Sequence, residues 1–361
     1  MTRLTIAIPT YNRPLALART LQSLAPQIGG GVDVLVLDNA STASAAETAV
    51  SVLGSPPPPW IRCIRHAANI GGNTNILRCL EMAGGDWVWI LGDDDHPAPT
   101  AIAEIRAAIA EHPDADSFNF CTSIQPSRDE FAVASLDELL DRCDSLSNLI
   151  FISAGVYRRT AYAGYLQSAF HYTHTSMPQV VLLLCGALQG RRTVFSRRFT
   201  VGWIEADAGQ RWPHYLFFQF AEVIEILPTF RHQQHMLRLL AYGEAQESRV
   251  ELLRWALFSQ LHHPEAPAAL LFVAKGAWTR AQLSPAWAQR LQWRCTATAA
   301  SFLHRHDALI WRLWSWVHRR RHGRPLQRNP GVAAFHAMLF HHRDPAASAA
   351  PQSPGQASGP A

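Results

Sequence analysis

The stretch Trp87-Val-Trp-Ile-Leu-Gly-Asp-Asp-Asp95 decides the fold, because a short apolar run ends there in three consecutive carboxylates. The apolar residues through Leu91 predict a buried parallel strand, and Gly92 lets the backbone turn. The acids then follow the carboxyl end of the strand, where open α/β sheets bind their ligands. Neighbouring carboxylates repel one another, and their hard oxygen atoms suit Mg²⁺ or Mn²⁺. The stretch therefore predicts an α/β sheet whose edge carries a metal site made of Asp93, Asp94 and Asp95.

A second interpretation of the three acids is a solvated turn that caps the helix after His96 and Pro97. The sequence on the amino-terminal side favours the metal site, because similar apolar runs recur there. Strands are predicted over residues 4–10, 32–38 and 61–64, and each is followed by a polar turn and an amphipathic helix. Two more strands are predicted after the acids, over residues 117–121 and 148–157.

Polar side chains gather where these early strands end. Pro9-Thr-Tyr-Asn12 closes the first strand, Asp38-Asn-Ala-Ser41 closes the second, and Asn69-Ile-Gly-Gly-Asn73 follows the third. Such residues suit hydrogen bonds to a base or a ribose, or the capping of the next helix. We therefore expect one polar edge of the sheet to hold a ligand.

The chain resembles the family 2 glycosyltransferases with the A-type glycosyltransferase fold. The resemblance rests on four segments in the family's order and spacing, and it covers roughly the first 200 residues. It implies a Rossmann-like α/β domain with a mostly parallel central sheet, followed by a helical C-terminal region. The four segments are Pro9-Thr-Tyr-Asn-Arg-Pro14, Leu37-Asp-Asn-Ala-Ser41, Asn69-Ile-Gly-Gly-Asn-Thr-Asn75 and Leu91-Gly-Asp-Asp-Asp95.

The resemblance also implies a nucleotide-sugar donor, a divalent cofactor, Mg²⁺ or Mn²⁺, and inversion at the anomeric carbon. By this resemblance Thr10, Tyr11 and Asp38 hold the nucleotide base and the ribose. Asp93 and Asp94 match the ribose and metal positions, and Asp95 is expected to share the metal. The residues expected to bind the donor are Pro9, Thr10, Tyr11, Asn12, Asp38, Asn39, Asn69, Gly71, Asn73 and Asp93.

The catalytic base that this resemblance implies is missing. Many relatives carry a Glu-Asp pair at the start of a helix that begins here with Pro178 and Gln179. Neither residue accepts a proton at neutral pH, although the attacking acceptor hydroxyl has to lose one. Histidine suits this task, with an ordinary pKa of about 6.5. The candidate bases are His174 first, then His171, Asp207 and Glu205, and each is alternatively a polar surface or helix-cap residue.

The composition is that of a globular protein with a large core, since 48% of the 361 residues are hydrophobic. Six cysteines show no CxxC pair, and the sequence enters a strand at once without a signal peptide. No apolar run approaches the roughly 18 residues of a membrane-spanning helix. We therefore expect a cytoplasmic protein with reduced thiols.

Three regions are predicted. A nucleotide-sugar-binding catalytic domain covers residues 1–205, and a helical region on the acceptor or membrane side covers residues 206–345. A disordered tail, which lacks charge and apolar anchors, covers residues 346–361. From Glu251 onward the chain has 13 Lys or Arg against 4 Asp or Glu, so its C-terminal part is basic.

Residues 302–321 predict a basic, aromatic helix. An arginine cluster follows its apolar stripe, and tryptophans flank the stripe. We expect this helix either to dock on the catalytic domain or to lie on an anionic membrane surface with its arginines on phosphates. The stripe consists of Phe302, His306, Leu309, Ile310, Leu313 and Val317.

Together these features predict a metal-dependent glycosyltransferase of bacterial surface polysaccharide synthesis, such as that of lipopolysaccharide O-antigen or capsule. The expected acceptor is a saccharide, in particular a lipid-linked one at the inner face of the cell membrane, and no nucleic-acid partner is expected. One alternative is a sugar nucleotidyltransferase, but the turn Pro9-Thr-Tyr-Asn12 lacks a glycine-rich, basic phosphate loop. Another is a non-catalytic module that binds nucleic acid or membrane surfaces through the Arg/Trp-rich C-terminal part.

Overall fold

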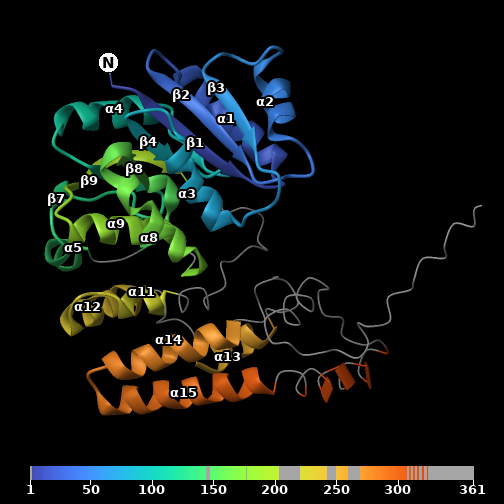
Figure 1. The fold of residues 1–361 in the computed structure, drawn as a ribbon, viewed down its shortest axis with the longest axis vertical. Coiled ribbons are helices and arrows are strands. Elements are labelled where there is room, and N and C mark those ends of the chain that lie inside the picture. Colours follow the sequence, from blue (N-terminus) through green and yellow to red (C-terminus); the bar gives the residue numbers. More distant parts are fainter. Residues whose placement is uncertain are drawn as a thin grey trace, which may run out of the picture. The chain divides into compact units, whose positions relative to one another are not determined.

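The computed structural model describes residues 2–143, 147–175, 177–202, 220–241, 249–258 and 269–306, with a few single positions up to 323. The chain forms two compact units (Figure 1). The first comprises Met1–Gln246 and Gln282–Arg290, and the second comprises Glu247–Ala281 and Leu291–Ala361. Several sequence predictions fall outside the described residues, namely those for Glu205, Asp207, Ile310, Val317 and the tail 346–361.

Within the described residues, nine strands form one sheet in the first unit. Their order is β3-β2-β1-β4-β8-β6-β9-β5, and β7 pairs with β9. The strands are β1 (Leu4–Thr10), β2 (Val32–Asp38), β3 (Ile61–Arg65), β4 (Trp87–Ile90), β5 (His96–Pro97), β6 (Ser117–Thr122), β7 (Phe131–Val133), β8 (Gly155–Arg158) and β9 (Thr193–Gly202).

The first four strands confirm the predicted parallel α/β sheet. β1 pairs in parallel with both β2 and β4, and β2 pairs in parallel with β3. β8 runs antiparallel between β4 and β6, so the rest of the sheet is mixed. Because Ala7 pairs with Ile90 and Thr10 pairs with Asp38, the ends of these strands meet at one edge of the sheet.

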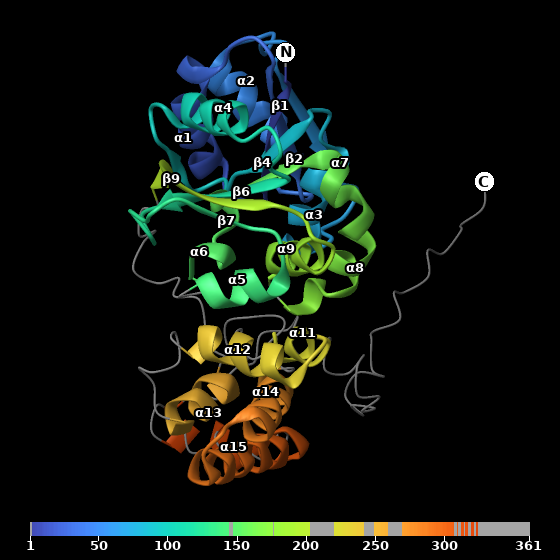
Figure 2. The ribbon, with the colours of Figure 1, turned by 90° about the vertical axis from the view of Figure 1, so that its left-hand side faces the viewer.

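Helices cover both faces of the sheet (Figure 2). One apolar core packs α1 (Pro14–Leu24), α2 (Ala45–Leu53) and α4 (Ala101–Glu111) against the strands. The core on the opposite face includes residues of helices from α3 to α12 and Leu283. The first unit runs to Gln246, and the functional boundary expected at residue 205 stays a prediction. The helices of this second face are α3 (Gly72–Met82), α5 (Leu136–Arg142), α7 (Arg159–Tyr162), α8 (Leu166–His171), α9 (Pro178–Leu188), α11 (Ala221–Glu225) and α12 (Phe230–Ala241).

The second unit is helical where it is described, as the sequence predicted for the C-terminal region. It contains α13 (Arg249–Phe258) and most of α14 (Ala269–Leu283) and α15 (Trp287–Arg305). Among the helices described in either unit, none combines the length and the apolar character that crossing a bilayer requires.

The strand predicted over residues 148–157 is wrong for most of its length. The segment forms the short helix α6 (Ser147–Ile150) and a 3₁₀ turn (Ile152–Ala154), and only then begins β8 at Gly155. A short apolar run does not distinguish a buried helix from a strand. Here tertiary hydrogen bonds decide, because the Asn148 amide donates to Asn119 Oδ1 at 2.7 Å and to the Phe120 carbonyl at 2.8 Å.

Candidate functional site

Asp93 lies at the carboxyl edge of the sheet beside the end of β1, where the sequence predicted it. The Thr10 hydroxyl donates to Asp93 Oδ2 at 2.6 Å. Thr20 of α1, which the sequence analysis missed, donates to the backbone carbonyls of Asp93 and Asp95 at 2.9 and 3.1 Å. Burial raises the pKa of Asp93 to about 6, against the opposing effects of the Thr10 hydrogen bond and the nearby Arg13 charge.

Asp95 is turned into the protein. Its Oδ2 accepts a hydrogen bond from the Ser153 hydroxyl, which in turn accepts the Gly92 N–H at 2.8 Å. Burial raises the pKa of Asp95 to about 7. A Cβ at Gly92 would lie 2.5 Å from Asp95 Oδ2, so the turn requires glycine there. In this arrangement Asp95 helps to build the acid turn, and its share in a metal site stays a prediction.

Asp94 presents the most accessible carboxylate of the acid turn. Its side chain is 32% exposed, whereas that of Asp93 is 7% exposed. The Arg13 guanidinium contacts both acids, with Nη1 at 2.5 Å from Asp94 Oδ2 and at 3.4 Å from Asp93 Oδ1. Arg13 was not among the predicted site residues, although the motif Pro9-Thr-Tyr-Asn-Arg-Pro14 contains it.

The donor set of the acid turn fits a divalent ion that is shared with a substrate. Across the described parts of the chain, no three His, Cys, Asp or Glu side chains form a group that could hold a metal ion. Mg²⁺ commonly uses one or two carboxylates, water and substrate phosphates. Asp94 and the second oxygen of Asp93 could supply those carboxylate ligands, and a diphosphate would have to complete the site.

Asp38 is buried at the end of β2, and backbone amides occupy both of its oxygens. Oδ1 accepts from the Ser41 N–H at 2.8 Å, and Oδ2 accepts from the Ala45 N–H at 3.2 Å. Burial acts to raise the pKa of Asp38, but these hydrogen bonds, the Ser41 hydroxyl and the Arg65 charge outweigh it and lower the pKa. Asp38 therefore stays ionised at neutral pH and shapes the loop before α2.

Asn39 and Asn69 join the loops that follow β2 and β3. Asn39 Nδ2 donates to Asn69 Oδ1 at 2.8 Å, and Asn39 Oδ1 accepts from the Ile70 N–H at 2.9 Å. Gly71, at φ +86°, adopts the left-handed conformation that starts α3. The structure thus brings together three of the residues predicted to bind the donor.

Hydrogen bonds join the turn after β1 to the turn after β2. Asn12 adopts φ +54°, donates its N–H to Ser41 Oγ at 2.9 Å, and accepts the Thr42 N–H on Oδ1 at 2.7 Å. Tyr11, just before it, is 44% exposed. Pro9 lies within β1 itself. The rigid turn therefore leaves an aromatic ring accessible at the polar edge.

Of the candidate bases that the structure describes, His174 is the one that hydrogen-bonds to a carboxylate. Its Nε2 lies 2.7 Å from Glu222 Oε2, a partner that the sequence analysis missed. The preceding carbonyl, that of Thr173, accepts from Asn73 Nδ2 at 2.8 Å, which ties this segment to the start of α3. His171 ends α8, and its ring packs edge-on against Tyr172.

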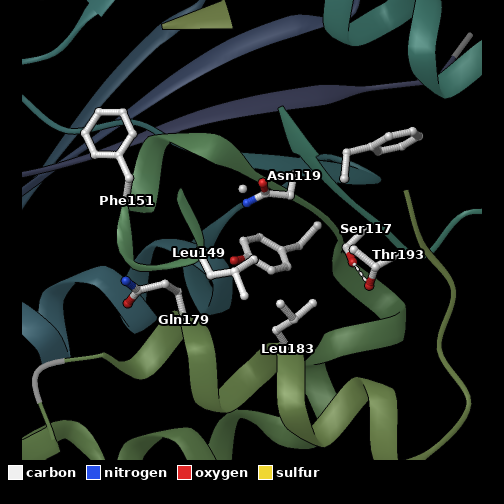
Figure 3. Close-up of a pocket in the computed structure, with 10 residues that line it drawn as sticks. Ser117, Asn119, Leu149, Phe151, Gln179, Leu183 and Thr193 are labelled. Atoms are coloured by element: carbon white, nitrogen blue, oxygen red, sulfur yellow. Dashed lines mark hydrogen bonds between the residues drawn. The ribbon is translucent and has the colours of Figure 1, made fainter. Parts of the chain in front are cut away.

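Gln179 occupies the position of the usual base but is buried. Its amide donates to the Ile150 carbonyl, and none of the described residues hydrogen-bonds its Oε1. It lines an internal cavity of about 10 Å³ together with Asn119 and Ser117, which bonds Thr193 at 2.8 Å (Figure 3). This space holds at most one water molecule. Gln179 therefore packs inside the domain.

Residues 5–173 match the sequence model of the family described as glycosyl transferase family 2. This part of the chain is therefore similar to that family. The match includes every residue predicted to bind the donor or a metal and ends one residue before His174.

The related sequences are similar over shorter stretches. The abequosyltransferase RfbV of Salmonella typhimurium is 30% identical over 113 residues, which cover 31% of this chain and 34% of that protein. A Mycobacterium tuberculosis protein is 30% identical over 99 residues, which cover 27% of this chain and 30% of that protein. The chain thus matches about a third of the length of these relatives.

Solved structures show the fold over a longer stretch. S. aureus TarS 1–349 in complex with UDP-GlcNAc has a TM-score of 0.56 at 15% identity, and the match covers 84% of this chain and 92% of that one. The longer S. aureus TarS structure has a TM-score of 0.51 at 18% identity, and the match covers 82% and 55% of the two chains. The predicted A-type glycosyltransferase fold is thereby confirmed.

Proposed function

We propose that this protein is a metal-dependent, inverting glycosyltransferase that uses a nucleotide-sugar donor. The observation that carries the proposal is the convergence of Thr10, Asp93 and Asp94 with the Asn39–Asn69 pair at one edge of a family 2 sheet. Residues 1–205 carry the donor and metal site, and the helical region 206–345 serves the acceptor side. The donor and metal residues are those predicted from the sequence.

Tyr11 and the loops at the polar edge of the sheet bind the nucleotide part of the donor. The exposed Tyr11 ring stacks on the base, and the polar loops after β2 and β3 surround the ribose. Asp93 and Asp94 would hold a divalent ion, whose charge would neutralise the diphosphate leaving group. TarS is a structural relative solved with UDP-GlcNAc, so UDP-sugars are the first donors to test.

Nucleotide binding tests this assignment directly. We expect UDP, GDP or dTDP to raise the melting temperature only with Mg²⁺ or Mn²⁺ present, because carboxylates and diphosphate repel each other without the cation. Asp94→Asn should abolish the metal-dependent shift, whereas the matched change Asp129→Asn at an exposed position should preserve it. Equal stabilisation in EDTA would remove the metal from the proposal.

His174 is the proposed general base. Inversion requires the acceptor hydroxyl to attack opposite the leaving diphosphate and to lose its proton. If Glu222 accepts the proton on Nε2, Nδ1 of His174 is the free acceptor for the proton of the hydroxyl. His171, Asp207 and Glu205 are the remaining alternatives.

Single substitutions test the proposed base. His174→Ala should lower kcat about 10²-fold while donor binding persists, since the loss is confined to the transition state. Glu222→Gln should lower kcat less, because it removes the orienting carboxylate and keeps the imidazole. His232, which also pairs with a carboxylate at 3.0 Å, provides the control substitution to Ala. Near-parental kcat in His174→Ala would transfer the role to His171, Asp207 or Glu205.

The proposed acceptor is a saccharide, in particular a lipid-linked one at the inner face of a bacterial membrane during surface polysaccharide synthesis. A relative named abequosyltransferase supports sugar transfer as the activity. Phe302, Leu309 and Leu313 of the predicted amphipathic stripe are 59%, 66% and 61% exposed, which supports a peripheral surface contact.

Vesicle binding tests the membrane contact. The protein should sediment with anionic vesicles at low salt and be released as salt screens its arginines. Replacing the exposed Arg319 and Arg320 with Gln should weaken sedimentation and leave the fold unchanged. Equal sedimentation with neutral vesicles, or none with anionic ones, would remove the anionic surface from the proposal.

A further inference from the structure

Arg13 stands where two carboxylates of the acid turn converge. Its Nη1 atom lies 2.5 Å from Asp94 Oδ2 and 3.4 Å from Asp93 Oδ1. The Thr10 hydroxyl already occupies the other oxygen of Asp93 at 2.6 Å. Oxygen atoms of two neighbouring carboxylates thus face one cationic nitrogen. Two adjacent ligands of a divalent ion have this arrangement.

The backbone of Arg13 is fixed, and its side chain is partly exposed. Arg13 caps the start of α1, directly before Pro14 at the first helical position. The preceding residue, Asn12, is held in the left-handed region by hydrogen bonds with Ser41 and Thr42. The Arg13 side chain is nevertheless 42% exposed. Rotation about the side-chain bonds would carry the guanidinium away from the carboxylates while the backbone of the turn stays in place.

A guanidinium and a divalent ion exclude each other at this position. Both are cations attracted to the same two carboxylates, and at contact distance they repel each other in a partly buried site. Arginine has an alternative partner once a diphosphate is bound, because its planar fork pairs well with phosphate oxygens. The carboxylates then become available to the ion.

We propose that Arg13 is the built-in counter-cation of the donor-free acid turn, and that it yields Asp93 and Asp94 to the divalent ion when a diphosphate binds. This inference rests on the proposed function, since a nucleotide-sugar donor supplies the diphosphate. Arg13 is then a positioning residue that couples metal binding to donor binding. The bare ion binds weakly, and the ion and the nucleotide bind together.

The test measures Mn²⁺ binding to the full chain without nucleotide, by electron paramagnetic resonance of the free ion at neutral pH. Arg13→Gln should bind Mn²⁺ at least about tenfold more tightly than the parent, which corresponds to about 1.4 kcal/mol. Arg13→Lys, which keeps a cation in place, should stay near the parent. Arg19→Gln removes the same charge from an exposed position of α1 and should also stay near the parent. Adding Asp94→Asn to Arg13→Gln should abolish the gain.

A second measurement uses UDP as the probe. UDP should tighten Mn²⁺ binding to the parent at least about tenfold, and by less in Arg13→Gln, where no guanidinium has to be displaced. Arg13→Met retains the aliphatic stem and replaces Arg13→Gln if the glutamine variant loses its circular dichroism spectrum.

Parental or weaker Mn²⁺ binding in folded Arg13→Gln or Arg13→Met overturns the inference, and so does an equal gain in Arg19→Gln. A different measurement would contradict the proposed function. If none of UDP, GDP and dTDP raises the melting temperature of the parent protein with Mn²⁺ present, the donor assignment is wrong. The comparison of bare Mn²⁺ binding between parent and variant still decides the competition between Arg13 and the ion.

Discussion

The free energy of unfolding should fall less with rising pH in Asp95→Asn than in the parent protein. Asp95 is 3% exposed, and burial raises its pKa from 3.8 to about 7. The folded state therefore binds this proton more tightly than the unfolded chain does. The resulting stability is fully present below the unfolded pKa and is lost as pH rises through the folded pKa, from about 4 to about 7.

The size of the effect follows from the interval between the two pKa values. Each pH unit within it corresponds to about 1.4 kcal/mol. The span from about pH 5 to pH 7 therefore removes about 3 kcal/mol from the free energy of unfolding. Asparagine keeps the shape of the side chain and an oxygen for the Ser153 hydroxyl, but it does not titrate. Relative to the parent, Asp95→Asn should gain about 3 kcal/mol between about pH 5 and pH 8.

Urea unfolding measures this difference at both pH values, in EDTA and at constant ionic strength. Asp93, whose pKa is raised to about 6, titrates in both proteins and largely cancels. Asp129→Asn changes an exposed carboxylate and should show no comparable gain. If the difference in the free energy of unfolding between the parent and Asp95→Asn is the same at both pH values, burial does not raise the pKa of Asp95.

Three further substitutions test the local geometry by thermal unfolding. Gly92→Ala places a methyl group 2.5 Å from Asp95 Oδ2 and should cost about 1–3 kcal/mol, whereas Gly84→Ala, with open space around it, should not; equal effects would contradict the close approach. Ser153→Ala removes the hydroxyl that accepts from the Gly92 N–H and donates to the Asp95 carboxyl, and it should cost about 1–3 kcal/mol; an unchanged melting temperature would contradict that role. Ala40→Gly should stabilise the protein by up to about 1 kcal/mol by relieving φ +60°, and a lower melting temperature would show that the backbone is unstrained there.

The sequence by itself determined the sheet and the edge where the polar residues gather. Apolar runs that end in polar turns are local signals, and parallel strands bring their carboxyl ends to one edge whatever the loops do. For this reason Thr10 and Asp93 could be expected to meet, although 83 residues separate them. The same logic put Asn39 and Asn69 at that edge, and the structure shows that their side chains are hydrogen-bonded there.

Tertiary structure alone decided what each side chain does at that edge. Asp95 meets Ser153 across 58 residues, Arg13 meets Asp94 across 81, and His174 meets Glu222 across 48. Ser153 even lies in a segment whose apolar pattern predicted a strand. These contacts depend on how loops and helices pack on the sheet, and the periodicity of a strand or helix carries no information about such packing. Three adjacent acids in the sequence therefore became one carboxylate bound to Thr10, one paired with Arg13 and one buried against Ser153.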